Sequence, residues 1–204
     1  MDLGKGIWSS WRVSGDIYPK WDGVLKCYEA AADLWKYQQP RTYNDPDMLE
    51  VGVGDLSFEE SQSHFVLWCM LSAPLILGLD VRKVKGEILQ LITNPSLIAI
   101  NQDKLLVQAS RTLLQPGLDL LLKPLADGSF AICLFNKTDR PIDNISINQR
   151  DILRHDNRIC MQEGDTLLAK DVLDSLAGWF LVQDCLGIAS QQPRCSLLYL
   201  AKRL

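Results

Sequence analysis

The sequence predicts an α/β half built of parallel βα units, followed by an antiparallel all-β half. Strand-like segments recur at even spacing in the first half: Tyr43 lies 31 residues after Arg12, and Leu75 lies 32 residues after Tyr43. That spacing is the length of a βα unit, and helical patterns fill the intervals. After about residue 105 these patterns stop and short β-like runs follow one another, which is typical of an antiparallel domain.

The first half begins with a strand over residues 11–17 and a helix from Asp22. Apolar residues of that helix recur at helical spacing on one face, and they are Val24, Leu25, Tyr28, Ala31, Ala32 and Trp35. A second helix follows Ser57 and ends near Leu71, because Ser57 and Glu60 stand at capping-box spacing.

Residues 72–78 form a wholly apolar run that contains Pro74 and ends at Gly78. Such a run predicts a strand covered on both faces, as in a parallel sheet. A third helix is predicted over residues 86–93, where Asn94-Pro95 ends it.

The second half, residues 106–204, is predicted to be an antiparallel β-sandwich without a helix. Two runs, residues 118–125 and 130–135, are joined by a hairpin signal at Ala126-Asp127-Gly128-Ser129. Further short strands are predicted at residues 142–147, 179–182 and 196–200. His155 is expected in a solvated loop.

Composition narrows the classes of function. The chain has 204 residues, of which 47% are hydrophobic, so it can bury a core, and its net charge of -4 does not favour a nucleic-acid partner. No apolar run has the length of a signal peptide or a membrane span. As written, the chain is expected to be soluble and cytoplasmic, without membrane contact, whereas a longer parent with a signal would be secreted or lysosomal. A homo-oligomer is compatible with the sequence.

The cysteines and short modification patterns carry little functional signal. Of six cysteines, Cys69 and Cys133 lie in apolar runs and are expected to be free, buried thiols. Asn136 and Asn144 begin matches to the glycosylation pattern that we treat as chance. No cofactor is predicted, and a metal site through Asp45 and Asp47 has little support without paired cysteines or histidines.

Two carboxylates lie close together in the segment Tyr43-Asn44-Asp45-Pro46-Asp47-Met48-Leu49. Asn-Asp-Pro predicts that the chain leaves regular structure, since the residue before a proline avoids the helical region. An isolated Asp-x-Asp is usually a capped, solvated turn. The neighbouring segments therefore decide its meaning.

Six segments occur in the order seen in the melibiase-type α-galactosidases and their α-N-acetylgalactosaminidase relatives, which residues 6–105 resemble. The segments are Trp11-Arg12-Val13-Ser14-Gly15-Asp16-Ile17, Asn44-Asp45-Pro46-Asp47-Met48-Leu49, His64-Phe65 with Leu67-Trp68, Ser72-Ala73-Pro74-Leu75, Asp80-Val81-Arg82, and Ile98-Ala99-Ile100-Asn101-Gln102-Asp103. Each is weak alone, and the ordered set is specific.

The resemblance implies a retaining glycosidase on a (β/α)8 TIM barrel, with strands six to eight within residues 1–105 and the β-sandwich after them. Its substrate would be an α-galactoside oligosaccharide or glycoconjugate. By matched position, Asp16 is the acid/base, and Arg12, Asp47 and Met48 contact the sugar. Asp45 and Trp11 would support the loop.

Departures from the family suggest a C-terminal fragment that is inactive alone. A barrel takes about 250 residues, and a retaining enzyme needs a second carboxylate about 5 Å from the first. The family's nucleophile, in a Lys-x-Asp pattern, should precede Asp16 and is absent. Lys20-Trp21-Asp22 matches the pattern but follows Asp16 and opens a helix, so we reject it. Arg41-Thr42-Tyr43 replaces the usual Gly-Gly-Trp.

Several alternatives stay open. Galactose and N-acetylgalactosamine specificity cannot be separated on these strands. The chain could also be a non-catalytic carbohydrate-binding or interaction module, or one half of a split enzyme, which exposed aromatics in the β half would support. Those aromatics, Phe130, Phe135, Trp179, Phe180 and Tyr199, are expected in the core. Arg12 with Asp16 could be a plain ion pair, and His64 is expected to be a hydrogen-bonded core histidine.

Overall fold

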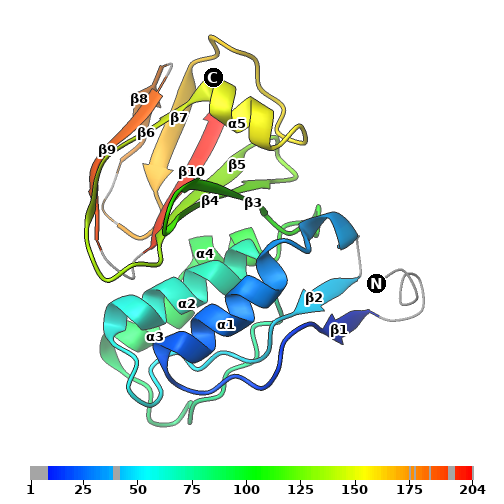
Figure 1. Cartoon of the computed structure of the whole chain (residues 1–204), viewed down its shortest axis with the longest axis vertical. Coiled ribbons are helices and arrows are strands. Elements are labelled where there is room, and N and C mark those ends of the chain that lie inside the picture. Colours follow the sequence, from blue (N-terminus) through cyan, green and yellow to red (C-terminus); the bar gives the residue numbers. More distant parts are fainter. Residues whose placement is uncertain are drawn as a thin grey trace. The chain divides into compact units, whose positions relative to one another are not determined.

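The computed structural model describes residues 9–38, 42–174, 176, 178–183, 185–192 and 196–203. The chain divides into two compact units, Met1–Ala109 and Ser110–Leu204 (Figure 1), and the sequence predicts this boundary at residue 105. Residues 1–8, Arg41 and the side chain of Tyr199 lie outside the described part.

Parallel strand pairing organises the first unit. Strand β1 (Ser10–Arg12) pairs in parallel with β2 (Tyr43–Asp45), so that Arg12 lies opposite Asp45. The ladder continues through backbone hydrogen bonds from Tyr43 to Ser9 and from Val13 to Asp45, both 2.9 Å. A single parallel bridge, Leu49 with Leu77, extends the arrangement.

Two predicted strands of the first unit differ from the structure: one is shorter and the other does not form. The strand predicted over residues 11–17 ends at Arg12, because the chain bends at Ser14 and Gly15. Residues 72–78 form no strand, and Ile76 is 61% exposed, so the prediction of a strand buried on both faces is wrong. Among the described residues, this segment pairs only through the bridge at Leu77. Its apolar composition predicts a strand but does not show whether other strands pair with it.

The described residues of the first unit also form four α-helices and a short 3-10 helix. They are α1 (Trp21–Ala32), η2 (Trp35–Tyr37), α2 (Phe58–Met70), α3 (Gly86–Ile92) and α4 (Pro95–Asn101). The capping box predicted at Ser57 and Glu60 is present, and α3 ends where expected. Trp35 lies beyond α1, in η2, whereas the sequence placed it on the α1 face.

The helix α4 was not predicted, because Asn94-Pro95 was interpreted only as a stop signal. The same residues also start a helix: the Asn94 side chain accepts hydrogen bonds from the amides of Ser96 and Leu97, and Pro95 occupies the first helical position. Asn94-Pro95 therefore both follows the end of α3 and begins α4.

The second unit is built from antiparallel strands, as predicted. Six of them form one sheet in the order β3-β4-β5-β10-β7-β8, and β6 pairs with β9 in another (Figure 1). Their bounds are β3 Ser110–Gln115, β4 Leu118–Pro124, β5 Phe130–Asn136, β6 Ile142–Asn148, β7 Leu167–Asp171, β8 Phe180–Val182, β9 Cys185–Gln191 and β10 Ser196–Arg203. The predicted β4–β5 hairpin is present, and Gly128 in its turn has a φ of 83°.

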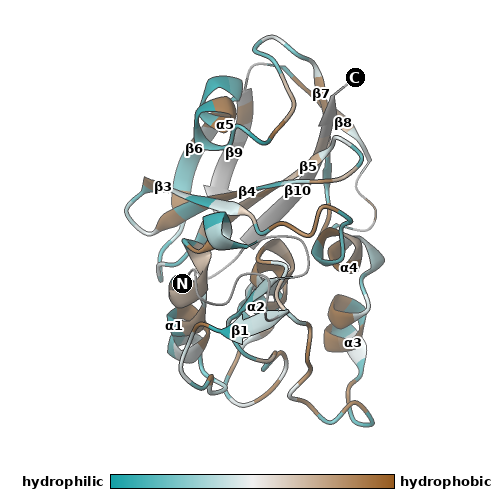
Figure 2. Cartoon of the chain, turned by 90° about the vertical axis from the view of Figure 1, so that its right-hand side faces the viewer, coloured by the Kyte–Doolittle hydropathy of each residue, from teal (hydrophilic) through white to brown (hydrophobic). Residues whose placement is uncertain are grey.

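A shared apolar core joins the two sheets of the second unit. It includes Leu120 and Leu122 of β4, Ile132 of β5, Ile147 of β6 and Leu186 of β9. The unit also contains a helix, α5 (Gln149–His155), which carries both hydrophilic and hydrophobic residues (Figure 2) and contributes Ile152 to this core.

The helix α5 corrects two predictions. The sequence suggested no helix in this half and a loop around His155, yet His155 ends α5. The Asn148 side chain accepts a hydrogen bond from the amide of Asp151 and so caps the helix. Asn148 is a capping signal in the sequence, but the seven residues of α5 are too few to show a clear helical period.

Burial separates the remaining expectations. Cys69 and Cys133 are buried free thiols, as predicted. Asn136 is fully buried, and its side-chain amide donates to the carbonyl of Arg140 at 2.8 Å. Its side chain therefore supports the turn after β5. Phe130 and Phe135 are buried, but Trp179 and Phe180 are 44% and 40% exposed, which corrects their placement in the core. Within the described residues, no helix is long and apolar enough to cross a membrane.

The capping box of α2 gives a first prediction. The substitution Ser57→Ala removes the acceptor for the Glu60 amide, so we expect the free energy of unfolding of the first unit to fall by about 1 kcal/mol. Urea unfolding followed by tryptophan fluorescence measures this, since five of the six tryptophans lie in the first unit. Ser57→Thr keeps the hydroxyl and is the matched control. An equal loss in both variants would contradict the capping role.

Candidate functional site

Arg12 brings two carboxylates together at the end of β1. Its Nη2 donates hydrogen bonds to Asp16 Oδ1 at 3.2 Å and to the carbonyl of Gly15 at 3.0 Å, and it also contacts Asp47 Oδ2. Arg12 reaches Asp16 because the chain bends at Ser14 and Gly15, beyond the end of β1. The three residues matched from sequence therefore form one cluster.

Asp47 is buried and its carboxylate is fully engaged. Oδ2 accepts the amide of Ile17 at 2.7 Å in addition to Arg12, and Oδ1 accepts the amide of Met48 at 2.7 Å. The residue is 8% exposed and its φ is 92°, a left-handed conformation that is uncommon outside glycine. Asp47 is thus held in one orientation.

Asp16 stands in the opposite environment. Its side chain is fully exposed, while that of Arg12 is 36% exposed. The bend that carries it is supported from α1, where the Cys27 thiol lies 3.8 Å from the carbonyl of Gly15. Burial raises the pKa of Cys27, which keeps the thiol protonated as a donor.

The other matched residues surround this cluster. Asp45 Oδ1 accepts the amide of Asp47 at 2.9 Å, and the Ser14 hydroxyl donates to the carbonyl of Pro46 at 2.9 Å. Trp11 is partly buried in β1, opposite Asn44. Met48 is 40% exposed, so its side chain borders solvent beside Asp47.

The helix α2 lies behind the loop that follows Asp47. The indole Nε1 of Trp68 donates to the carbonyl of Asp47 at 2.7 Å, and His64 Nε2 accepts the amide of Glu50 at 3.0 Å. Burial lowers the pKa of His64 to about 3, so the imidazole is a neutral, hydrogen-bonded core group, as expected. Burial and the charge of Asp47 raise the pKa of Glu50.

The acidic side chains of the loop accept hydrogen bonds from the backbone of the chain. Asp45 and Asp47 both accept backbone amides. Over the described parts of the chain, no group of three or more His, Cys, Asp and Glu side chains could hold a metal ion.

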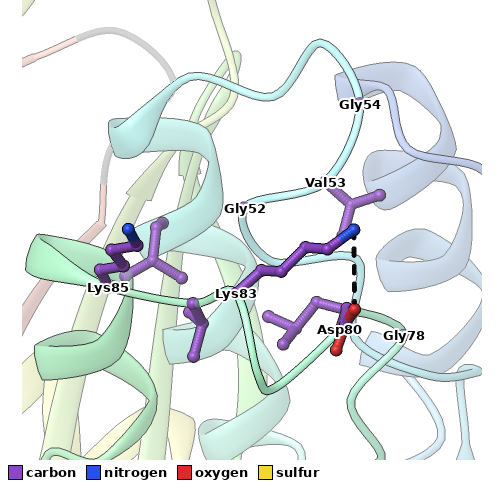
Figure 3. A pocket seen from close by; sticks show the side chains of 10 residues that line it. Gly52, Val53, Gly54, Gly78, Asp80, Lys83 and Lys85 are labelled. Carbon is purple, nitrogen blue, oxygen red and sulfur yellow. Dashed lines mark ion pairs between the residues drawn. The ribbon is translucent and has the colours of Figure 1, made fainter.

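A hollow of about 470 Å³ lies next to this loop, between residues 52–54 and residues 78–88 (Figure 3). Its acid, Asp80, pairs with Arg82 at 2.8 Å and with Lys83 at 3.7 Å. Hydrogen bonds from Arg82 lower the pKa of Asp80, which makes it a poor proton donor. Gly78 lines the hollow and also lies against the loop, since a Cβ at this position would be 3.0 Å from the Met48 sulfur.

Sequence reasoning missed the residues that support the cluster. Cys27 and Glu50 lie in no matched segment, Ser14 has no predicted role within its segment, and His64 and Trp68 are not predicted to contact the loop. The four-residue spacing of His64 and Trp68, which places both on one side of a helix, is the signal that could have linked them to the loop.

Comparison with known proteins gives a consistent family. Residues 3–103 match the family described as alpha galactosidase A. The chain is 35% identical over 168 residues to an alpha-galactosidase of Cyamopsis tetragonoloba, a match that covers 82% of this chain and 39% of that protein. It is 39% identical over 145 residues to alpha-galactosidase A of Cellvibrio japonicus, covering 66% of this chain and 36% of that protein.

Solved structures agree with these matches. A candidate alpha-galactosidase/melibiase of Bacteroides fragilis superposes with a TM-score of 0.82 at 34% identity, covering 95% of this chain and 42% of that one. The alpha-galactosidase of Saccharomyces cerevisiae with raffinose gives a TM-score of 0.81 at 20% identity over 98% of this chain and 61% of that one, which shows a shared fold. The chain spans less than half the length of the two curated relatives named above.

The buried histidine predicts a pH dependence of stability. The pKa of His64 falls from 6.5 to about 3 on folding, so below pH 6.5 the unfolded state binds a proton that the folded state does not. We expect the free energy of unfolding to fall by up to about 1.4 kcal/mol for each pH unit below that value. Urea unfolding between pH 7 and about 5 measures this slope.

The control for this prediction is His64→Gln, which keeps a neutral acceptor but cannot titrate. All other titrating groups are common to the two proteins, so the difference between their pH slopes isolates His64. Parallel slopes would show that the imidazole is not held neutral by burial.

Proposed function

The chain belongs to the α-galactosidase (melibiase) family, and we propose that it carries the acid/base side of a retaining α-galactosidase site. Residues 1–105 would be the barrel part, with β1 as strand six, β2 as strand seven and the segment around Leu77 as strand eight. The parallel β1–β2 pairing and the Leu49–Leu77 bridge support this assignment. Residues 106–204 would be the C-terminal β-sandwich domain.

The unequal environments of two carboxylates around one guanidinium carry the proposal. Both oxygens of Asp47 accept backbone amides, and its side chain is buried. Asp16 is fully exposed beside Arg12. Pairs of acids in contrasting environments are how glycosidases divide their roles. Asp47 therefore suits a fixed wall that contacts the sugar, with Met48, whereas Asp16 can reach a leaving group.

The proposed chemistry follows from these positions. Asp16 donates its proton to the glycosidic oxygen while the bond from that oxygen to the anomeric carbon breaks and a second carboxylate bonds to the carbon. Asp16 then takes a proton from the water that releases the sugar. Arg12 orients Asp16 and Asp47 and donates to sugar hydroxyls, and Asp45 and Trp11 support the loop.

The second carboxylate is proposed to come from a βα segment outside these residues. Asp22, in a Lys-x-Asp match that follows Asp16, lies in the first turn of α1, and its carboxylate accepts the Tyr18 hydroxyl at 2.6 Å. That hydrogen bond lowers the pKa of Asp22 and fixes the group to the helix start. The substrate would be an α-linked galactoside such as an oligosaccharide or a glycoconjugate.

Leaving-group dependence tests the role of Asp16. We expect the chain alone to be inactive, and to hydrolyse α-galactosides once fused to the preceding barrel segment of an α-galactosidase relative. In that fusion, Asp16→Asn should lower kcat/KM for an alkyl α-galactoside by roughly a thousandfold, the scale of general acid catalysis. The loss should be much smaller for a para-nitrophenyl α-galactoside, whose leaving group needs no proton to depart.

Asp139→Asn, in the turn after β5, is the matched control and should leave both rates unchanged. An equal loss of Asp16→Asn activity on both substrates would assign Asp16 another role. Hydrolysis by the isolated chain that disappears in Asp16→Asn would contradict the proposal that the nucleophile lies elsewhere.

A second candidate function is carbohydrate binding by the β unit without catalysis. The observation that favours it is the exposure of Trp179 and Phe180, at 44% and 40%, beside Leu181 at 62% on the edge strand β8. Exposed aromatic faces are the groups that bind polysaccharides by stacking and apolar contact.

This alternative makes its own prediction. If β8 binds carbohydrate, electrophoresis of the full chain through a gel containing galactomannan should be retarded, and Trp179→Ala should remove the retardation because a stacking surface is lost. Leu113→Ala, which removes an exposed apolar side chain from β3 at the other edge of the sheet, is the control. Equal migration of all variants in gels with and without the polysaccharide would exclude the alternative.

A further inference from the structure

Three side chains on one face of α2 contact the backbone of the loop that follows Asp47. Trp68 Nε1 donates to the carbonyl of Asp47 at 2.7 Å, His64 Nε2 accepts the amide of Glu50 at 3.0 Å, and Ser61 Oγ accepts the amide of Gly52 at 3.1 Å. Their spacing of three and four residues places them in a row along the helix. We call Ser61, His64 and Trp68 the α2 row.

The α2 row is buried and internally packed. Ser61 is 1% exposed, and His64 and Trp68 are 0% exposed. The rings of His64 and Trp68 meet edge to face, with centroids 4.1 Å apart and planes at 85°. Each polar group therefore has little freedom to turn away, and a buried group that lost its partner would leave an unpaired amide or carbonyl behind.

The loop has few other ways to satisfy its backbone. Leu49 exchanges hydrogen bonds with Ile76 and Gly78 at 2.7 and 2.8 Å, and Asp47 receives support for its amide from Asp45 at 2.9 Å. The carbonyl of Asp47 and the amides of Glu50 and Gly52 turn the other way, toward α2. The α2 row thus supplies the partners of three backbone groups in the segment from Asp47 to Gly52.

We infer that Ser61, His64 and Trp68 are positioning residues for the sugar-contacting wall formed by Asp47 and Met48. The inference rests on the proposed function for the meaning of that wall, but not for the geometry. Asp47 has a left-handed backbone, with a φ of 92°, and such a residue relaxes unless its neighbours hold it. Trp68 holds the carbonyl of Asp47, while His64 and Ser61 fix the chain three and five residues further on.

Packing alone would not explain the row. Apolar residues at these positions would fill the same buried space but would leave the Asp47 carbonyl and the Glu50 and Gly52 amides without these partners. The row therefore acts on the loop through hydrogen bonds as well as through packing. Neutral His64 is an acceptor, which the amide of Glu50 requires, and the Trp68 indole is a donor, which the carbonyl of Asp47 requires.

Amide hydrogen exchange of the full chain tests the inference without substrate. In His64→Leu, exchange of the Glu50 amide should rise by about tenfold more than that of the α2 amides, because its acceptor is lost. His64→Gln supplies a carbonyl acceptor and should restore the Glu50 amide to within about threefold of the parent protein. Ser61→Ala, a smaller change, should act in the same way on the Gly52 amide.

Phe65→Leu is the matched control, since Phe65 is 1% exposed on the same helix and should raise exchange of α2 and loop amides by a common factor. The Nε–H resonance of Arg12, whose guanidinium contacts Asp47 through Nη2, should shift in His64→Leu and Trp68→Phe but not in Phe65→Leu. Loop exchange that follows α2 in every variant, or no rescue by His64→Gln, would show that the row only packs. Neither result depends on hydrolysis, so the glycosidase proposal stands or falls separately.

Discussion

The backbone of Asp47 is the constraint on which the rest of this site depends. A non-glycine residue with a φ of 92° costs on the order of 1–3 kcal/mol and persists only where its surroundings fix it. Here the amide of Asp47 binds Asp45, its carbonyl binds Trp68, and both its side-chain oxygens accept amides. The conformation aims the carboxylate toward Arg12, so the position of the guanidinium follows from the strained residue.

The guanidinium of Arg12 contacts two acids whose environments differ. Arg12 contacts Asp47, whose oxygens are already occupied, and Asp16, whose side chain lies in solvent. A buried carboxylate that accepts several hydrogen bonds is held in one orientation, whereas the exposed carboxylate borders solvent. One guanidinium thus contacts a fixed acid and an exposed acid.

The sequence predicted those parts of the fold that local patterns encode. The capping box at Ser57, the α2 and α3 helices and the β4–β5 hairpin all depend on neighbouring residues, and all are present. Residues 72–78 and Trp179 depended on distant neighbours, and both predictions failed. A pairing of Arg12 with Asp16 is among the expectations from the sequence, but the contact depends on the bend at Ser14 and Gly15, which interrupts the strand predicted over residues 11–17. The hydrogen bonds of α2 to the loop join residues that no local pattern connects.

His64 binds the loop backbone as a neutral group. The amide of Glu50 needs an acceptor. Burial, and then the charge of Asp47, raise the pKa of Glu50, so this region already disfavours negative charge. A buried carboxylate at position 64 would add a charge that the interior penalises. Burial lowers the pKa of the His64 imidazole to about 3, so near neutral pH it accepts the same hydrogen bond without adding a charge. The Glu50 amide is therefore held by a neutral partner.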